Sequence, residues 1–266
     1  MLLIQYLILG IIQGFTEPLP ISSSGHLKIF KSIFNNYALN DMNFEIIVNF
    51  GSLLAILLLY KNEILKIIKD FLNYTITKEK KYEVNFKYAW LIVIGTIPAA
   101  ICGLFIKDFI EKYFSIKLVG IMLVITSILL FSIRDNKGYK EKEDIKISDS
   151  IKIGLIQIFA LLPGISRSGS TVYASMKCNL KRETALNYSF MLYIPISIAS
   201  FILGLSDLFN SNNFKYLFIP YIISMISAAI ITYYSAKLFI NIMKKGKLIY
   251  FSIYCFVVGC LTIILL

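Results

Sequence analysis

"GFTEPLPISSSGHL", residues 14–27, is a polar break inside a very apolar chain. It contains one acid (Glu17), two prolines, three consecutive serines and the only histidine of the chain, His26. The apolar stretches "MLLIQYLILGII" (1–12) and "FEIIVNFGSLLAILLLY" (44–60) lie on either side of it. Because polar and ionisable groups are costly in such surroundings, the break indicates a functional site rather than an ordinary loop.

The composition is that of a membrane protein. Of the 266 residues, 57% are hydrophobic and 16% are charged, and the mean hydropathy is +0.72. A soluble domain has about 45–50% apolar and about 25% charged residues, and a membrane-spanning helix needs roughly 17–25 apolar residues. Runs of that kind, two of them slightly short, occupy residues 44–60, 88–106, 118–133, 184–205, 216–240 and 248–266. These runs predict an all-α polytopic membrane protein with six transmembrane helices. No basic residue precedes Lys28, so a cleavable signal peptide is not expected.

Basic residues gather in three stretches between the apolar runs: 61–87, 134–152 and 237–247. Lysine and arginine accumulate in cytoplasmic loops, and placing all three loops there gives six spans of alternating direction. The net charge of +11 therefore reports topology, and no nucleic-acid partner is expected. The four cysteines lack metal-ligand spacing and are expected to be small buried apolar residues.

Two segments remain outside the spans, 1–34 and 149–182. Each consists of two apolar parts separated by Pro, Gly and Ser, which predicts a re-entrant helix–loop–helix hairpin. "IIQGFTEPLPISSSG" (11–25) also aligns with "LIQIFALLPGISRSG" (155–169) at a constant offset of 144. The pattern predicts an internal repeat.

The repeat divides the single membrane domain, 1–266, into two halves. The first, 1–133, has one hairpin and three spans, and the second, 149–266, has the same. Because three is odd, the halves have opposite orientations in the membrane. Inverted repeats with broken helices are typical of a site near the bilayer midplane, where the repeats meet.

Serines at the breaks favour helix N-caps, and two helix N-termini directed at the midplane form a site for phosphate. Arg167, in "PGISRSGST" (163–171), adds a cation suited to phosphate oxygens. The alternative is that Arg167 pairs with a carboxylate such as Glu17 or Glu45. Arg167 can serve in both roles, as a phosphate ligand and as the partner of a carboxylate.

A cation site is also indicated. Gln13 and Glu17 are four residues apart and share a helix face, as do Glu45 and Asn49 on the next span. Carboxylate and amide oxygens suit a hard divalent cation. In the alternative, Glu17 is only the counter-ion of Arg167.

His26 lies beside three hydroxyls and the predicted anion site, which favours an acid–base role. Ser23 is then a nucleophile with His26 as its base. The alternatives are a satisfied buried histidine, and serines Ser22–Ser24 that only cap a helix. Together the groups predict phosphoryl transfer on a substrate with a lipid tail.

A second hypothesis is a transporter that flips a lipid phosphate, because inverted repeats commonly support alternating access. Glu17, Ser23, His26 and Arg167 together favour the enzyme, since carrying an anion requires the cation but no acid–base pair. The sequence leaves the oligomeric state open, a homodimer included.

"QGFTEPLPISSSGHL" (13–27) and "LPGISRSGST" (162–171) resemble the two signature motifs of the bacterial undecaprenyl-diphosphate phosphatase, or bacitracin-resistance, family. The resemblance covers the whole chain. It implies hydrolysis of the membrane lipid undecaprenyl diphosphate to undecaprenyl phosphate and inorganic phosphate, which recycles the carrier for peptidoglycan and other envelope polymers. It also implies bacitracin tolerance, a divalent cation (Mg²⁺ or Ca²⁺), and a multi-pass protein of the bacterial cytoplasmic (inner) membrane whose site faces the outer side.

The family's site residues carry over by motif. The resemblance implies metal binding by Gln13 and Glu17. It implies catalytic roles for Glu17, Ser23, His26 and Arg167, and substrate binding by Ser22, Ser166, Arg167, Ser168 and Thr171. Many members have glutamate where this chain has Gln13, so its metal affinity is expected to be lower. Pro18 is a second departure, and it is expected to end the first half-helix a residue early.

Overall fold

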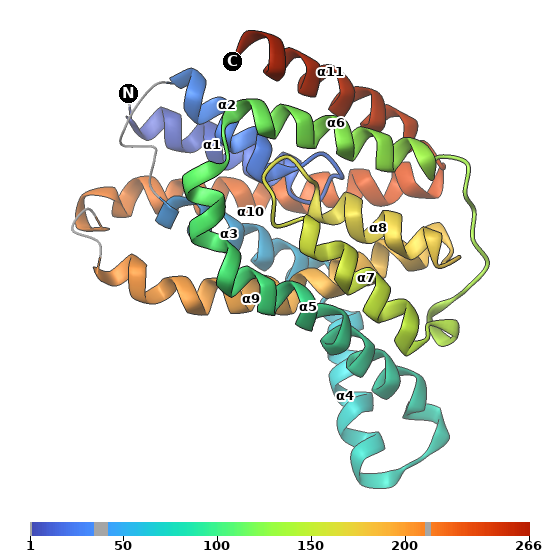
Figure 1. Cartoon of the computed structure of the whole chain (residues 1–266). Helices are drawn as coiled ribbons and strands as arrows, with labels where there is room; N and C mark the ends of the chain where they lie inside the picture. Colours follow the sequence, from blue (N-terminus) through green and yellow to red (C-terminus); the bar gives the residue numbers. More distant parts are fainter. Residues whose placement is uncertain (1, 35–41, 211–213) are drawn as a thin grey trace.

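The computed structural model describes residues 2–34, 42–210 and 214–266, which form α-helices and two 3-10 helices, with no β-strand among them (Figure 1). The 3-10 helices are η2 (Lys80–Tyr82) and η3 (Lys142–Asp144). The α-helices are α1 (Leu2–Thr16), α2 (Ser23–Phe34), α3 (Met42–Leu59), α4 (Lys61–Thr77), α5 (Glu83–Tyr113), α6 (Ile116–Ser132), α7 (Ile147–Phe159), α8 (Arg167–Lys177), α9 (Arg182–Asn210), α10 (Phe214–Lys244) and α11 (Ile249–Leu265). The predicted all-α class is confirmed.

The helices are those of a polytopic membrane protein. In the described part of the chain, α5, α9 and α10 contain stretches long and apolar enough to cross a membrane. The pair α3 and α4 is a fourth candidate if it counts as one span bent by 75°. Helices α1, α6 and α11 are apolar but shorter, at 15 to 17 residues. Each of the six predicted spans falls on one helix.

The prediction of a loop over residues 61–87 is wrong. Helix α4 occupies most of this segment, and the start of α5 occupies its end. Lysine is a good helix former, so its abundance here does not break the helix. The two helices pack through aromatic rings, with Phe71 stacked on Phe86 at 5.0 Å between centroids. Figure 1 shows α4 and the start of α5 projecting away from the rest of the bundle.

Both predicted hairpins are present as helix–turn–helix units. The first is α1 and α2 around the turn at 17–22, and the second is α7 and α8 around 160–166. Helix α1 packs along α10, and α7 packs along α5. The first helix of each hairpin therefore packs against a long helix of the other half of the chain. Helices α6 and α11 lie along each other in the same manner.

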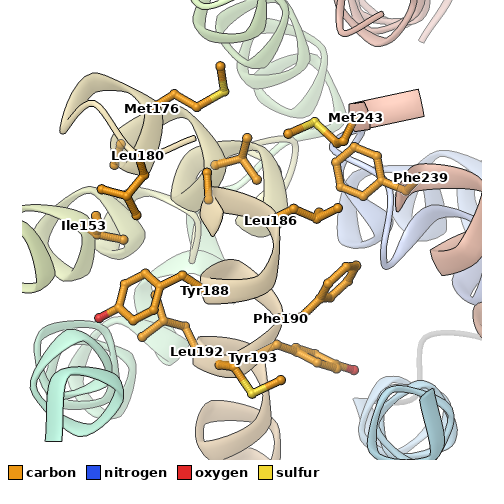
Figure 2. Packing of buried hydrophobic residues seen from close by; sticks show 14 of the residues in the cluster. Ile153, Met176, Leu180, Leu186, Tyr188, Phe190, Leu192, Tyr193, Phe239 and Met243 are labelled. Atoms are coloured by element: carbon orange, nitrogen blue, oxygen red, sulfur yellow. The ribbon is translucent and has the colours of Figure 1, made fainter. Parts of the chain in front are cut away.

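The main hydrophobic core surrounds α9 and packs against the two helices of the second hairpin, α7 and α8. Figure 2 shows part of it, with side chains from α7, α8, α9 and α10 in contact. Tyr188 is fully buried, and its hydroxyl donates to Leu91 O at 2.7 Å and lies 2.9 Å from Ser150 Oγ. A buried phenol with satisfied hydrogen bonds ties α9 to α5 and α7. The labelled core residues are Ile153, Met176, Leu180, Leu186, Tyr188, Phe190, Leu192, Tyr193, Phe239 and Met243.

Candidate active site

The tips of the two hairpins are in direct contact. The Gly164 N–H donates to Ser22 Oγ at 3.1 Å, and Ser168 Oγ donates to Leu19 O at 2.8 Å. Gly164 has φ +102°, and a Cβ there would lie 2.5 Å from Val119 O. Only glycine fits this conformation and this space, so the second tip can lie close against α6 while its N–H reaches Ser22.

The two tips are built alike. Ser22 Oγ accepts from the Gly25 N–H at 3.3 Å, and Ser166 Oγ accepts from the Gly169 N–H at 3.0 Å. The predicted capping by Ser22 is confirmed, and Ser22 itself adopts the left-handed region with φ +69°. Matching caps at an offset of 144 residues agree with the predicted repeat.

The caps leave free backbone amides at the start of each second helix. Among the described residues, the N–H groups of Ser23 and Ser24 in α2, and of Arg167 and Ser168 in α8, donate no hydrogen bond. Such amides, with the positive end of the helix dipole, form an anion-binding site. Two of these N-termini meet where the tips touch.

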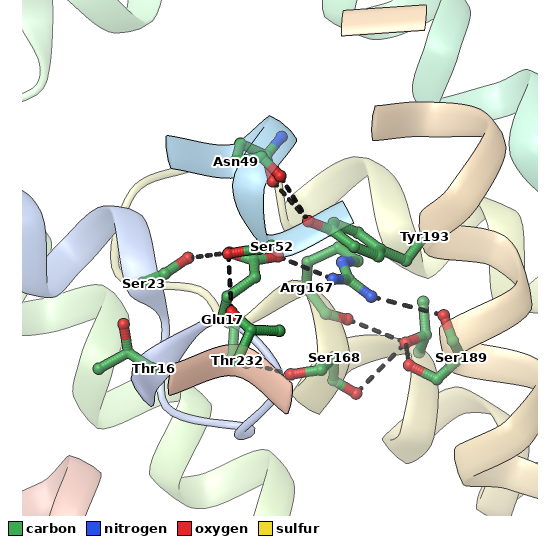
Figure 3. A network of polar contacts seen from close by, with 12 residues as sticks. Thr16, Glu17, Ser23, Asn49, Ser52, Arg167, Ser168, Ser189, Tyr193 and Thr232 are labelled. Carbon is green, nitrogen blue, oxygen red and sulfur yellow. Dashed lines mark hydrogen bonds and ion pairs between the residues drawn. The ribbon is translucent and has the colours of Figure 1, made fainter. Parts of the chain in front are cut away.

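Glu17 and Arg167 form an ion pair across the two tips, with 2.8 Å between Oε1 and Nη2 (Figure 3). The side chains are 11% and 16% exposed. The other carboxylate oxygen of Glu17 accepts from Ser23 Oγ, and also from Gln13 Nε2 at 3.1 Å. The alternative in which Arg167 pairs with Glu17 is therefore what the structure shows. A hydroxyl bonded to a carboxylate is the arrangement of an activated nucleophile.

Tyr193, on α9, was not predicted as a site residue. Its ring lies under the Arg167 guanidinium, 4.1 Å from the ring centroid, and its hydroxyl donates to Asn49 Oδ1 at 2.7 Å. Arg167 Nη1 also donates to Ser189 O at 3.4 Å. These contacts fix the guanidinium plane. In sequence, Tyr193 is one tyrosine in an apolar span, and nothing there marks it.

A pocket of about 220 Å³ opens between the tips. Its lining includes the predicted residues Gln13, Glu17, Ser22, Ser23, Ser166 and Arg167. Glu45 and Asn49 from α3, and Tyr193 and Ser197 from α9, complete its polar part. Residues from both halves of the chain therefore line one cavity, as the repeat predicted.

His26 does not line this pocket. It is 3% exposed, and its Nδ1 lies 2.8 Å from Ser22 O, while its Nε2 lies 2.8 Å from the hydroxyl of Tyr254 on α11. Because a carbonyl only accepts, Nδ1 carries the proton and Nε2 accepts from the tyrosine. Both ring nitrogens are bonded to groups other than Ser23, so the structure does not bring His26 to the Ser23 hydroxyl, and its role as a base stays a prediction. The alternative of a satisfied buried histidine is what the structure shows.

Ser168 and Thr171 also lie outside the pocket lining, although both were predicted to bind substrate. The Ser168 hydroxyl is bonded to Leu19 O. Thr171 Oγ1 donates to Arg167 O at 3.0 Å and lies 2.6 Å from Ser189 Oγ. Their hydroxyls thus hold the Arg167 turn in place, because they satisfy buried groups around it.

The donors for the implied divalent cation are all oxygen donors: Gln13, Glu17, Glu45 and Asn49. The described residues contain no group of three or more His, Cys, Asp or Glu side chains that could hold a metal unaided. Glu45 is paired with Lys31 at 2.7 Å. Two carboxylates and two amides, with phosphate and water oxygens, fit a hard divalent cation.

The fold and site define a polytopic membrane protein with a buried acid–arginine pair between two hairpin tips. The family described as "Bacitracin resistance protein BacA" matches residues 6–261, so the chain belongs to this family. The sequence-based resemblance is confirmed.

Relatives match over nearly their full length. The chain is 46% identical over 264 residues to "Undecaprenyl-diphosphatase 1" of Bacillus cereus, covering 99% of this chain and 97% of that protein. It is 43% identical over 266 residues to "Undecaprenyl-diphosphatase 1" of Bacillus licheniformis, covering 99% and 98%. The protein of that name from Halalkalibacterium halodurans is 41% identical over 266 residues, covering 100% and 97%.

Proposed function

We propose that this chain is an undecaprenyl-diphosphate phosphatase that releases inorganic phosphate and regenerates undecaprenyl phosphate for envelope polymer synthesis. Family membership and the names of its near-full-length relatives support this function, and the family name supports bacitracin resistance. One structural observation carries it: Ser23 and Arg167 contact the same carboxylate, Glu17, inside one pocket.

The pocket binds the diphosphate head. The Arg167 guanidinium supplies a planar fork for phosphate oxygens, and Tyr193 holds its plane. The free amides at the starts of α2 and α8 supply further donors. These donors are fixed before the substrate arrives, so they stabilise charge that builds up on the phosphoryl oxygens.

Ser23 Oγ attacks the terminal phosphorus, and Glu17 accepts the hydroxyl proton. The bond between this phosphorus and the bridging oxygen breaks, and undecaprenyl phosphate leaves with that oxygen. The leaving undecaprenyl phosphate takes up the proton from Glu17, which is a carboxylate again. Glu17 then deprotonates a water that attacks the phosphoserine, and this proton returns to Ser23 Oγ as inorganic phosphate leaves. Glu17 is the base because its carboxylate contacts the Ser23 hydroxyl, whereas His26 does not. His26 instead supports the Ser22 turn.

Gln13 and Glu17, with Glu45 and Asn49, would hold the divalent cation. The bound ion supplies positive charge against the diphosphate, which lowers the repulsion met by the attacking oxygen.

The membrane arrangement is part of the same proposal. Helices α3, α5, α6, α9, α10 and α11 are the six spans, and the pairs α1–α2 and α7–α8 are re-entrant hairpins, in two inverted repeats over 1–133 and 149–266. The basic stretches that include α4, the segment 134–146 and the end of α10 support a cytoplasmic position for these ends. The pocket then faces the outer side of the bacterial cytoplasmic membrane. Matching tip caps and the reciprocal packing of α1 on α10 and α7 on α5 support the repeat.

The test is phosphate release from undecaprenyl diphosphate by the purified chain in detergent with Mg²⁺ or Ca²⁺. The wild type is expected to release one phosphate per lipid monophosphate formed. Ser23→Ala and Glu17→Gln are each expected to lower kcat by about 10³-fold or more. A wild type that releases no phosphate, yet moves a labelled polyprenyl phosphate across proteoliposomes, would overturn the enzyme in favour of a transporter. Full turnover by Ser23→Ala would overturn Ser23 as the nucleophile.

A further inference from the structure

A second cavity, of about 510 Å³, lies at the open end of the second hairpin. It is lined by the first turns of α7 and the last turns of α8, while the tip at 160–166 lies at the other end of these helices. Its polar residues are Lys140, Asp149, Lys152, Tyr173, Lys177 and Asn179. None of them lines the active-site pocket.

One rim of this cavity is fastened in place by backbone hydrogen bonds. The N–H groups of Tyr139 and Lys140 both donate to Asn179 O at 2.9 Å, and the Lys181 N–H donates to Lys140 O at 2.9 Å. Gly138 has φ +67°, and a Cβ there would lie 2.1 Å from Leu180 O. The segment before η3 is therefore held against the end of α8, which positions Lys140 over the cavity.

The cavity carries surplus positive charge. Lys140 Nζ lies 2.9 Å from Asp149 Oδ2, and this hydrogen bond raises the pKa of Lys140, so its ammonium stays charged. Lys152 and Lys177 are exposed, and neither forms an ion pair with another described residue. Three lysines against one aspartate leave two positive charges uncompensated.

One wall of the same cavity is apolar. Leu155 is 49% exposed, and Ile156 and the ring of Tyr173 lie beside it. A free inorganic anion has no apolar part that could pack against this wall. A ligand with a phosphate at one end and an acyl chain at the other matches both surfaces, and basic pockets between membrane helices on the cytoplasmic side bind such headgroups.

We propose that this cavity is a binding site for the phosphate headgroup of an anionic phospholipid of the cytoplasmic leaflet, distinct from the active site. Lys152 and Lys177 bind the phosphate oxygens, Lys140 stands fixed behind them, and the acyl chain lies along Leu155. The proposal rests on the membrane orientation given above and not on the phosphatase chemistry.

The test uses the delipidated full chain in a neutral detergent, titrated with dioctanoyl phosphatidylglycerol, dioctanoyl phosphatidylcholine or inorganic phosphate. Bound lipid is counted by native mass spectrometry. The wild type is expected to bind phosphatidylglycerol at one site in preference to phosphatidylcholine. Because each lysine contributes about a factor of five near an anionic headgroup, Lys152→Gln with Lys177→Gln is expected to weaken this binding about 30-fold. Phosphate release is expected to stay at the wild-type rate.

The control is Lys66→Gln with Lys69→Gln, which removes two exposed lysines of α4 and the same charge. Retained phosphatidylglycerol binding in the control would support the site. Equal weakening by both double variants would show charge attraction without a site and would overturn the proposal. Equal binding of the two phospholipids would also overturn it. Displacement of the lipid by inorganic phosphate of similar affinity would overturn the lipid as the ligand. If the wild type binds phosphatidylglycerol at this site but releases no phosphate from undecaprenyl diphosphate, that result would count against the proposed function alone.

Discussion

Arg167 Nη2 lies 2.8 Å from Glu17 Oε1, although the two residues are 150 positions apart and belong to different hairpins. The internal repeat does not match these two residues to each other. At the offset of 144, Glu17 corresponds to Leu161, and Arg167 corresponds to Ser23. The two tips share a backbone design but contribute different chemistry. In the proposed mechanism the first tip supplies the base and the nucleophile, and the second supplies the guanidinium.

Replacing Arg167 by lysine tests whether the fork, and not only the charge, is required. Lysine keeps the charge but loses the planar pair of donors and the stacking on Tyr193. Arg167→Lys is expected to lower kcat/KM for undecaprenyl diphosphate by about 10²-fold to 10³-fold. Arg134→Lys, at an arginine outside the pocket that bonds Phe131 O and pairs with Asp135, is the control and should keep full turnover. Wild-type kinetics in Arg167→Lys would refute the proposed phosphate contact.

The cation site predicts a second difference between matched variants. Glu45 lines the pocket and pairs with Lys31, whereas Glu83 pairs with Lys87 far from it. A chelator is expected to abolish phosphate release, and added Mg²⁺ or Ca²⁺ to restore it. Glu45→Gln should raise the divalent concentration for half-maximal rate about tenfold, because one charged ligand is lost. Glu83→Gln should leave this concentration unchanged. An unchanged metal titration in Glu45→Gln would remove Glu45 from the site.

The contact between the buried His26 and the half-exposed Tyr254 is expected to support the first tip. Tyr254→Phe deletes the only donor to Nε2 in the described part of the chain, which leaves a buried acceptor unpaired. The free energy of unfolding should fall by about 1 kcal/mol. Thermal unfolding in detergent measures this change. Tyr250→Phe, on the same helix and 57% exposed, removes a hydroxyl that is not the one bonded to His26, and it should change the midpoint little. Equal midpoints for the two variants would show that the contact contributes no stability.

Gly164 is expected to be the position where the second tip tolerates a side chain least. Gly164→Ala combines φ +102° with a contact of 2.5 Å to Val119 O. The expected cost is about 1–3 kcal/mol for the backbone conformation alone. Gly103→Ala is the control, because the nearest atom to its Cβ is a flexible Leu161 methyl at 3.8 Å. The midpoint of thermal unfolding and the rate of phosphate release should both fall in Gly164→Ala and stay unchanged in Gly103→Ala. A Gly164→Ala protein as stable and active as the control would mean that the second tip and α6 accommodate the methyl group.

Much of the fold follows from the sequence, because long apolar runs and polar breaks leave few alternatives in a membrane. The six predicted spans and both hairpins coincide with helices, and the two tips meet. Helix α4 differs from the prediction because a lysine-rich stretch between two apolar runs fits a cytoplasmic loop as well as a helix. Leu65, Ile68, Leu72 and Ile76 line one of its faces at helical spacing, and they could have revealed it.

The site was predictable only in part, because sequence proximity does not give side-chain direction. Residues 22 and 26 are four apart, so His26 turns back to the Ser22 carbonyl. Ser23 lies on another side of the same helix and reaches Glu17. Tyr193 and Tyr254 come from distant helices, and only the packing of those helices brings them to the tips. Residues of this kind carry no local signal.

The bond between Ser22 and Gly164 has a consequence for any motion of the two halves. The contact between the two tips lies where the halves meet. A rocking motion of one half against the other would therefore separate Ser23 and Glu17 from the Arg167 guanidinium. Under the proposed mechanism, an open conformation of this chain would therefore be unable to cleave the diphosphate. If the chain carries lipid across the bilayer, cleavage and carriage alternate in time and never occur in the same conformation.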